Sequence, residues 1–316
     1  MKIVILDRNT VTNKDISFAE IESLGDIRYF DVLPKEKLVS AIDDAEVVVC
    51  NKAQLDRSII EKCPKLKFIG LFATGYNNID TACAKEKGIV VCNVPGYSTE
   101  AVAQLTFSMI LALSGSFCEY TTSTRNGGWI KSDTFSYFPF PLRELKDKTL
   151  GIFGYGSIGR EVAKIGRAFG MKIITYTRTP SKVTEAETVS LNELFSRSDF
   201  LSLHAPLTPE TTKIINEETL SLMKKSAYLI NTSRGGAIDE DALAKALNEG
   251  IIAGAGLDVL AVEPMLPDNP LRTAKNCLIT PHIAWAPIET RVRLITMVAE
   301  NIKAFIEDNP INVVNR

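Results

Sequence analysis

Length, composition and charge limit what this 316-residue chain can be. Its 45% hydrophobic and 23% charged residues are typical of a folded protein, and its length suits two domains of ordinary size. The 36 basic and 38 acidic residues are spread along the chain and leave a formal charge of -2, which excludes a basic surface that could hold nucleic acid. We therefore expect a small-molecule partner.

The N-terminus and the cysteines favour a cytoplasmic protein. The opening residues MKIVILDRNT lack the basic start, apolar stretch and cleavage site of a secretory signal. The longest apolar run, residues 101–113, is shorter than the roughly 20 residues that a membrane span needs. The six cysteines form no C-x-x-C pair and have no neighbouring histidine, so we expect free thiols, no disulfide framework and no metal site.

The first third of the chain alternates short β-branched runs with helical stretches. Strands are expected at residues 3–6, 47–50, 68–71 and 89–92. This alternation predicts a parallel sheet covered by helices. A helix then begins near Thr99, continues to Leu113 and ends near Gly115, and we place a domain junction at its start.

Residues 126–148 show neither the helical nor the strand period. The segment is rich in aromatic residues and proline. Exposed aromatic clusters usually mark contacts, so the segment is either an arm that covers another subunit or a packed loop.

A second series of strands follows, at residues 150–153, 173–176, 200–204, 228–231, 254–259 and 278–280. Six strands with intervening helices are typical of a doubly wound dinucleotide-binding fold. The last long helix, residues 288–306, comes after this sheet, and spacing alone does not assign it to either domain.

The G-x-G-x-x-G pattern at 154–159 follows the first strand of the second series and opens a helix. Gly154 permits the tight turn, Gly156 lets the backbone approach a pyrophosphate, and Gly159 lets the helix lie against the strand. We expect this loop to bind a dinucleotide through Gly154, Tyr155, Gly156, Ser157, Ile158 and Gly159.

The residues that follow the next strand, at 173–176, indicate which dinucleotide binds. An acid usually stands there and bonds the adenosine ribose, but here Thr177, Arg178 and Thr179 follow the strand and the first acid is Glu185. Arg178 can form a paired hydrogen bond to a 2′-phosphate. We predict a preference for NADP(H) over NAD(H); the alternative is a solvated basic turn in an enzyme that uses both.

Only two histidines are present to donate a proton near neutral pH. His282 follows the final strand, at the edge of the sheet where ligands of open α/β folds bind. His204 ends an earlier strand, and we give it a structural role in which it joins Ala205 and Pro206 in a contact to the adenine side of the cofactor.

Two further charged residues follow strands, Arg234 and Glu263. Reduction of a keto acid needs a guanidinium fork for the carboxylate and developing alkoxide, and a proton donor such as His282. A glutamate bonded to that histidine favours its charged form. We therefore predict Arg234, Glu263 and His282 as the catalytic residues.

These motifs resemble the D-isomer-specific 2-hydroxyacid dehydrogenase family, most of all its glycerate dehydrogenases, also called hydroxypyruvate reductases. The resemblance spans nearly the whole chain. It rests on the glycine loop, on His204-Ala-Pro-Leu-Thr208, Asn231-Thr-Ser-Arg-Gly235, Leu257-Asp-Val259, Glu263-Pro264 and Pro281-His282.

The resemblance implies an α/β fold with two doubly wound parallel-sheet domains. Residues 1–98 and 287–316 would form a flavodoxin-like substrate-binding domain, and residues 99–286 a Rossmann dinucleotide-binding domain. The active site would lie in the cleft between them, and the protein would be a homodimer.

The resemblance also implies roles for individual residues. Arg234 would bind and polarise the substrate, His282 would transfer the proton, Glu263 would hold the histidine, and Asp258 would contact the nicotinamide carboxamide. Thr232 and Ser233 would add cofactor contacts. The substrate carboxylate would be bound near Asn51, Lys52, Thr74, Gly75 and Tyr76. Hydroxypyruvate and D-glycerate would be the substrate pair, with glyoxylate as a second substrate.

Two alternatives remain open from the sequence, and a third is disfavoured. A dehydrogenase for D-lactate or phosphoglycerate would share the same motifs. A dinucleotide-sensing corepressor of the same fold would bind cofactor without turnover. A formate-oxidising relative is disfavoured, because that group has glutamine where Glu263 stands. The family's usual Glu-His pair before the apolar helix reads Gln104-Leu105 here.

Overall fold

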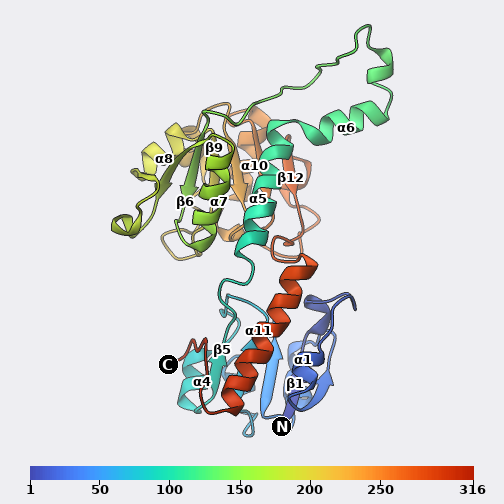
Figure 1. The fold of residues 1–316 in the computed structure, drawn as a ribbon, viewed down its shortest axis with the longest axis vertical. Helices are drawn as coiled ribbons and strands as arrows, with labels where there is room; N and C mark the ends of the chain where they lie inside the picture. The colour runs from blue at the N-terminus through green and yellow to red at the C-terminus, as the bar shows by residue number, and fades with distance from the viewer. The chain divides into compact units, whose positions relative to one another are not determined.

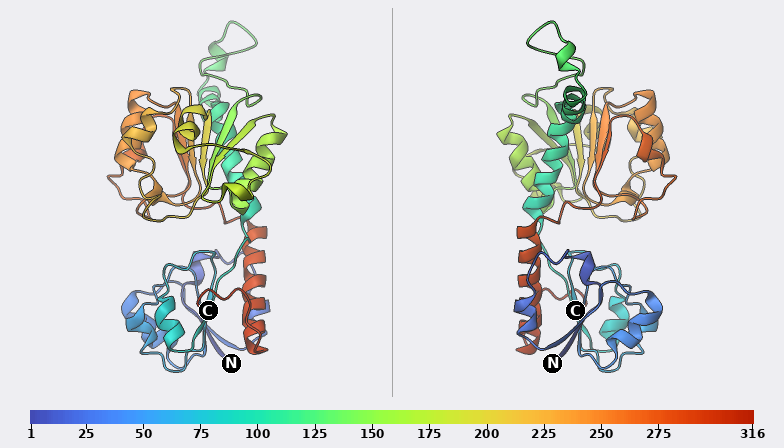
Figure 2. Two further views of the ribbon diagram at one scale, coloured as in Figure 1. Left: turned by 90° about the vertical axis from the view of Figure 1, so that its left-hand side faces the viewer. Right: turned by 90° about the vertical axis from the view of Figure 1, so that its right-hand side faces the viewer.

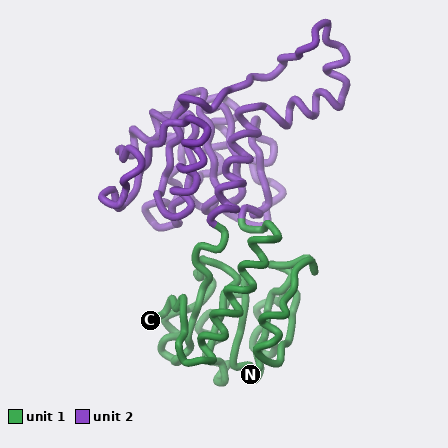
Figure 3. The backbone as a smooth tube through the Cα atoms, in the orientation of Figure 1, with its two compact units in different colours: residues 1–98, 285–316 green, residues 99–284 purple.

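The computed structural model describes all 316 residues and divides them into two compact units. Unit 1 comprises Met1–Ser98 and Trp285–Arg316, and unit 2 comprises Thr99–Ala284 (Figure 3). The chain returns to unit 1 at Trp285, whereas the sequence placed this return at residue 287.

Unit 1 contains a five-stranded parallel sheet in the order β2-β1-β3-β4-β5. This is the strand order of flavodoxin-like doubly wound folds. The strands are β1 (Lys2–Ile5), β2 (Asp26–Tyr29), β3 (Val47–Cys50), β4 (Phe68–Leu71) and β5 (Val90–Cys92). Strand β2 was not predicted, because it is an edge strand whose Asp-Ile-Arg-Tyr sequence is only partly buried and has no apolar run.

Helices cover both faces of this sheet. One hydrophobic core lies under α2 (Lys35–Ile42), α3 (Arg57–Ile60) and α4 (Thr81–Glu86). The other lies under α1 (Ala19–Glu22) and α11 (Ile288–Ile306), and a short 3-10 turn, η1 (Arg8–Thr10), follows β1. Figure 2 shows α11, in red, running along one face of the sheet. The contacts of α11 thus assign the last helix to unit 1, which spacing alone did not.

Unit 2 contains a seven-stranded parallel sheet in the order β12-β11-β10-β9-β6-β7-β8. Numbered from β6, the first six strands have the Rossmann order 3-2-1-4-5-6. They are β6 (Thr149–Phe153), β7 (Lys172–Tyr176), β8 (Glu187–Thr188), β9 (Phe200–Leu203), β10 (Tyr228–Asn231), β11 (Gly254–Leu257) and β12 (Cys277–Ile279). Strand β8 was missed because it is a two-residue, exposed edge strand. The prediction of two doubly wound parallel sheets is confirmed.

The two faces of this sheet have separate hydrophobic cores. The first lies under α5 (Thr99–Ser114) and α7 (Ser157–Ala168). The second lies under α8 (Leu191–Arg197), α9 (Glu217–Ser221) and α10 (Glu240–Glu249). The 3-10 turns of unit 2 are η2 (Trp129–Lys131), η3 (Pro180–Lys182), η4 (Gly235–Ala237) and η5 (Pro270–Thr273).

Helix α5 is apolar because it is a core helix. It is packed against α7, β10 and β11, and nine of its residues are buried. No single helix has the length and apolarity for a membrane crossing; α5 meets that criterion only together with the following helix, at a bend of 59°.

A projecting segment follows α5. Helix α6 (Phe117–Arg125) and the chain up to about residue 142 extend away from the body of unit 2 (Figure 1). We call residues 117–142 the arm. Its apolar side chains are largely exposed: Phe117 65%, Trp129 52%, Ile130 88%, Phe135 91%, Phe138 76% and Leu142 58%. Within the chain the arm is therefore not a packed loop.

Candidate active site

The three residues predicted to be catalytic follow three neighbouring strands. Strands β10, β11 and β12 are adjacent, and their last residues are in register: Asn231 pairs with Leu257, and Leu257 with Ile279. Arg234 comes three residues after β10, Glu263 six after β11, and His282 three after β12. Because carboxyl ends of parallel strands share one edge of the sheet, the three residues emerge at the same edge of unit 2.

The imidazole of His282 is bonded to the carboxylate of Glu263. His282 Nδ1 lies 2.7 Å from Glu263 Oε2, and Glu263 Oε1 accepts the backbone N–H of Leu260 at 3.0 Å. The ring is about one-third exposed. Since a carboxylate can only accept, Nδ1 carries the hydrogen, and the proton exchanged with a substrate must pass through Nε2.

Arg234 is exposed on a loop that is packed tightly against the segment leading to Glu263. Its Nη1 donates to the carbonyl of Ser233 at 2.7 Å. A Cβ atom on the next residue, Gly235, would lie 1.9 Å from the carbonyl carbon of Leu260. Only glycine allows this approach, so the backbones that carry Arg234 and Glu263 are in direct contact.

The side chain of Asp258 lies against the chain that carries His282. Asp258 is 1% exposed, and its carboxylate accepts hydrogen bonds from Thr280, Ile283 and Ala284. The contact of Asp258 with a nicotinamide carboxamide stays a prediction.

His204 lies in a different environment. Burial lowers the pKa of its imidazole to about 3, so the ring is neutral near pH 7. Its Nε2 lies 2.8 Å from Ser202 Oγ, and its Nδ1 is buried without a hydrogen-bond partner. A neutral ring does not supply protons, which leaves His282 as the only histidine for that task.

The glycine loop has the geometry that a pyrophosphate requires. Gly154 has φ +94°, and a Cβ there would lie 2.7 Å from the backbone nitrogen of Ala205. A Cβ on Gly159 would lie 2.3 Å from the carbonyl oxygen of Gly154, whereas a Cβ on Gly156 would meet no atom within 4 Å. Gly156 therefore faces open space at the start of α7, where unpaired N–H groups favour an anion.

The other predicted residues of the loop differ in what they can offer a cofactor. Tyr155 is buried and Ile158 is partly buried in the core, while Ser157 is exposed. The loop and the orphaned Nδ1 of His204 beside it fit a bound dinucleotide.

The loop after β7 carries Thr177, Arg178 and Thr179, all at least partly exposed. It has no acid of its own, but Glu210 approaches it from the chain after β9. The pKa of Glu210 is lowered, mainly by a hydrogen bond from Thr208 and in part by the charge of Arg178. Sequence reasoning missed Glu210, because it is 32 residues from Arg178 and only the fold brings the two charges near each other.

The hydroxyl groups of Thr232 and Ser233 form hydrogen bonds with other side chains of unit 2. Thr232 is buried, and its Oγ1 lies 3.0 Å from Thr106 Oγ1 on α5. Ser233 Oγ donates to Asn231 Oδ1 at 2.9 Å. Pro206, after β9, accepts a bond from Thr211 through its carbonyl.

In unit 1 the predicted substrate residues also share one sheet edge. Asn51 and Lys52 follow β3, while Thr74, Gly75 and Tyr76 follow the adjacent strand β4. The backbone N–H groups of Asn51 and Lys52 donate to the carboxylate of Asp7.

Asp7 was not predicted from the sequence. It is 2% exposed, and it also accepts from Ala53 N at 2.8 Å. Its one sequence signal is its position directly after an apolar strand. The amides of the 51–53 loop are therefore already bonded, so the exposed 74–76 loop is the better anion site of the two.

Together, a glycine loop at a helix start and an imidazole–carboxylate pair near an arginine define a dinucleotide-dependent dehydrogenase. Comparison with known proteins agrees. Residues 107–284 match the model of the D-isomer specific 2-hydroxyacid dehydrogenase, NAD binding domain. The chain belongs to this family and is an NAD(P)-dependent 2-hydroxyacid dehydrogenase.

Three similar proteins illustrate the range of relatives. A hydroxypyruvate reductase of Blautia hydrogenotrophica is 42% identical over the full length of both chains. A glyoxylate reductase of Aeropyrum pernix is 43% identical and covers 90% of this chain and 87% of its own. An acyclic imino acid reductase solved with NADPH and D-Arg is 34% identical, has a TM-score of 0.89, and covers 99% of this chain and 100% of its own.

Proposed function

We propose that this protein reduces hydroxypyruvate to D-glycerate, accepts glyoxylate as a second substrate, and uses NADP(H) in preference to NAD(H). The observation that carries the proposal is the 2.7 Å bond between His282 and Glu263, at the sheet edge where Arg234 also emerges. The hydroxypyruvate and glyoxylate reductases among the relatives support the substrate class.

The proposed division of labour follows from the chemistry of the three side chains. The guanidinium of Arg234 binds the substrate carboxylate and polarises the adjacent carbonyl through its planar fork. His282 Nε2 donates a proton to the carbonyl oxygen, and Glu263 stabilises the imidazole in its protonated form. The bound dinucleotide would supply the hydride to the carbonyl carbon.

We propose that unit 2 binds the dinucleotide and that unit 1 binds substrate. Gly156 and the amides at the start of α7 hold the pyrophosphate, and the loop of Thr74 to Tyr76 binds the substrate carboxylate.

The cofactor preference is supported by Arg178 in the loop after β7. A carboxylate usually stands in this loop and would repel a 2′-phosphate, whereas an arginine can bind it. The carboxylate of Glu210 lies in range of the same arginine and competes with a 2′-phosphate for it. A solved relative that carries NADPH supports the phosphorylated cofactor.

A panel of keto acids assayed with NADPH and with NADH tests the proposal. We expect oxidation of NADPH with hydroxypyruvate and slower oxidation with glyoxylate. A clear preference for NADH would contradict the cofactor assignment, and a preference for pyruvate or a phosphorylated keto acid would contradict the substrate. Binding of cofactor without turnover of any substrate would favour a regulatory protein.

Reduction of an imine is a second candidate, favoured by the similarity to the imino acid reductase. The same panel with methylamine added distinguishes the two. A rate that depends on the amine would indicate that the carbon–nitrogen double bond is the true acceptor of the hydride.

We also propose that the protein is a homodimer held by the arm. An apolar surface as exposed as that of Ile130 and Phe135 is stabilised when a second copy covers it.

A further inference from the structure

The C-terminal segment, residues 310–316, lies along the edge strand of the unit 1 sheet. Val313 forms an antiparallel bridge with Cys92, the last residue of β5. Figure 1 shows the C-terminus beside β5 and α4. Strand β5 is paired with β4, and β4 leads into the 74–76 loop. The C-terminal segment therefore lies one strand away from the loop that we propose as the site of the substrate carboxylate.

Three asparagines connect the C-terminal segment to this loop. Asn312 Nδ2 donates to Asn301 Oδ1 at 2.8 Å, and Asn301 Nδ2 donates to the backbone carbonyl of Asn93 at 2.9 Å. Asn93 Nδ2 in turn donates to the carbonyl of Thr74 at 2.7 Å. Asn301, within α11, is completely buried, and Asn93 is 9% exposed. Buried amide groups are costly to leave unpaired, so these bonds hold one another in place.

The start of the loop is held on its other side as well. Thr74 Oγ1 donates to the carbonyl of Val94 at 2.8 Å, and Val94 N donates to the carbonyl of Ala73 at 2.9 Å. Together with the bond from Asn93, these bonds fix the backbone of residues 73 and 74. None of them uses the N–H of Gly75 or of Tyr76, so both N–H groups remain for an anion.

We infer that Asn93 and Asn301 are positioning residues for substrate binding, because they hold the backbone of the 74–76 loop in the arrangement that receives the carboxylate. Asn312 extends this support into the C-terminal segment. The inference rests on the proposed function, which assigns the substrate carboxylate to this loop. Since reduction of the keto group leaves the carboxylate unchanged, a misplaced loop should weaken binding of substrate and transition state alike.

The first test is Asn301→Leu. Leucine has a similar size and suits a helix, but it can neither donate to the Asn93 carbonyl nor accept from Asn312. We expect the KM for hydroxypyruvate to rise roughly 10-fold, as when a hydrogen bond to a charged group is weakened. The kcat and the Kd of NADP, measured by calorimetry, should stay near the wild-type values. An unchanged KM in a folded variant would overturn the inference.

A double-mutant cycle shows whether the effect passes through Asn93. Asn93→Ala keeps the backbone carbonyl that Asn301 bonds but removes the amide that donates to Thr74. It should itself raise the KM. In this background Asn301→Leu should raise the KM less than it does alone, because the side chain that it positions is gone. Full additivity would contradict the inference.

The matched control is Asn315→Leu. Asn315 also lies in the C-terminal segment: its Oδ1 accepts from Val91 N at 3.0 Å, and its Nδ2 donates to the carbonyl of Ile89 at 2.8 Å. Neither partner bonds the 74–76 loop. We expect this variant to lose stability, measured as a lower Tm, but to keep the wild-type KM. A rise in KM as large as that of Asn301→Leu would trace the effect to a loosened unit 1 and overturn the inference.

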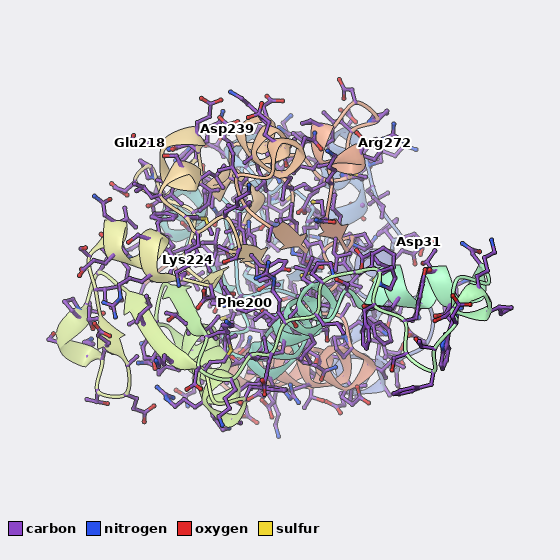
Figure 4. All side chains as sticks on the ribbon, turned by 90° about the horizontal axis from the view of Figure 1, so that it is seen from above. Asp31, Phe200, Glu218, Lys224, Asp239 and Arg272 are labelled. Atoms are coloured by element: carbon purple, nitrogen blue, oxygen red, sulfur yellow. The ribbon has the colours of Figure 1, made fainter.

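Two further variants keep the test decisive. Asn312→Gly covers the case in which Asn301→Leu does not fold, since glycine accepts the φ of +55° at this position and removes the donor to Asn301. Its KM should rise, though less. Lys224→Ala removes an ion pair of 2.9 Å with Asp199, which precedes β9 in unit 2; Lys224 is labelled in Figure 4. Its KM should not change, and a rise would contradict the inference by showing that any lost stability weakens substrate binding.

Amide hydrogen exchange gives a readout that needs no substrate. The N–H groups of Val94 and Ile79 donate to the carbonyls of Ala73 and Tyr76 and so report on the backbone of the loop. Both should exchange faster in Asn301→Leu than in Asn315→Leu. Equal rates would contradict the positioning role. A wild-type protein that reduces no keto acid would refute the proposed function, while exchange still decides whether Asn301 holds the loop.

Discussion

The two histidines of this chain differ in what surrounds their rings, and this difference gives the first prediction. His282 is bonded to a carboxylate, whereas His204 has no charged partner and is neutral near pH 7. His282→Ala should reduce kcat by ~10²-fold or more, as expected for loss of a general acid. His204→Ala should reduce it far less. Equal effects in steady-state assays would overturn the assignment of the proton donor.

His204 also predicts how stability depends on pH. Its imidazole has a pKa of about 3 in the folded state and of about 6.5 in an unfolded chain. Between these values only the unfolded chain binds the proton, so stability falls as the pH drops below about 6.5, by at most about 1.4 kcal/mol per pH unit from this one group. Urea unfolding at pH 7, 6 and 5 should show a smaller decrease for His204→Gln than for wild type. An identical decrease would mean that the ring is protonated in the folded protein.

At Arg234 the shape of the side chain should matter as well as its charge. Arg234→Lys keeps the charge but loses the planar fork. We expect a raised KM for the keto acid and a lower kcat, with an unchanged Kd for NADP. Near-normal kinetic constants would remove the arginine from the substrate site.

At the scale of elements, two glycines of the 154–159 loop should have different roles: Gly159 in the stability of unit 2 and Gly156 in the affinity for the cofactor. A Cβ on Gly159 would lie 2.3 Å from a backbone oxygen, so Gly159→Ala should destabilise unit 2 by about 1–3 kcal/mol, as overpacking does. Gly156→Ala meets open space and should leave the Tm of the free protein unchanged while raising the Kd of NADP. Equal losses of Tm in thermal unfolding would contradict this distinction.

The elements that were predictable are those with a strong apolar signal. Strand Val47–Cys50 is fully buried and forms an unbroken apolar run, and the core helix α5 buries nine of its residues. Strands β2 and β8 escaped prediction because they lie at sheet edges, where the residues remain partly solvated and the hydrophobic pattern is lost.

At the scale of the whole molecule, the exposed arm predicts that two copies of the protein associate. Ile130→Ser combined with Phe135→Ser should shift the protein towards monomer in light scattering, because both side chains are more than four-fifths exposed within one chain. Leu222→Ser, at an exposed apolar site outside the arm, is the matched control and should leave the mass unchanged. A wild-type protein that is monomeric at all concentrations would refute the proposed dimer.

The sequence by itself determined the two sheets, the glycine loop and the residue types of the candidate site. These follow from local pattern: apolar runs make buried strands, and a turn that needs Gly154 accepts no other residue without strain. Tertiary structure decided everything that depends on neighbours distant in the chain. The partners of Asp258, the approach of Glu210 to Arg178 and the assignment of α11 to unit 1 all arise from strand order and packing, which no local pattern contains.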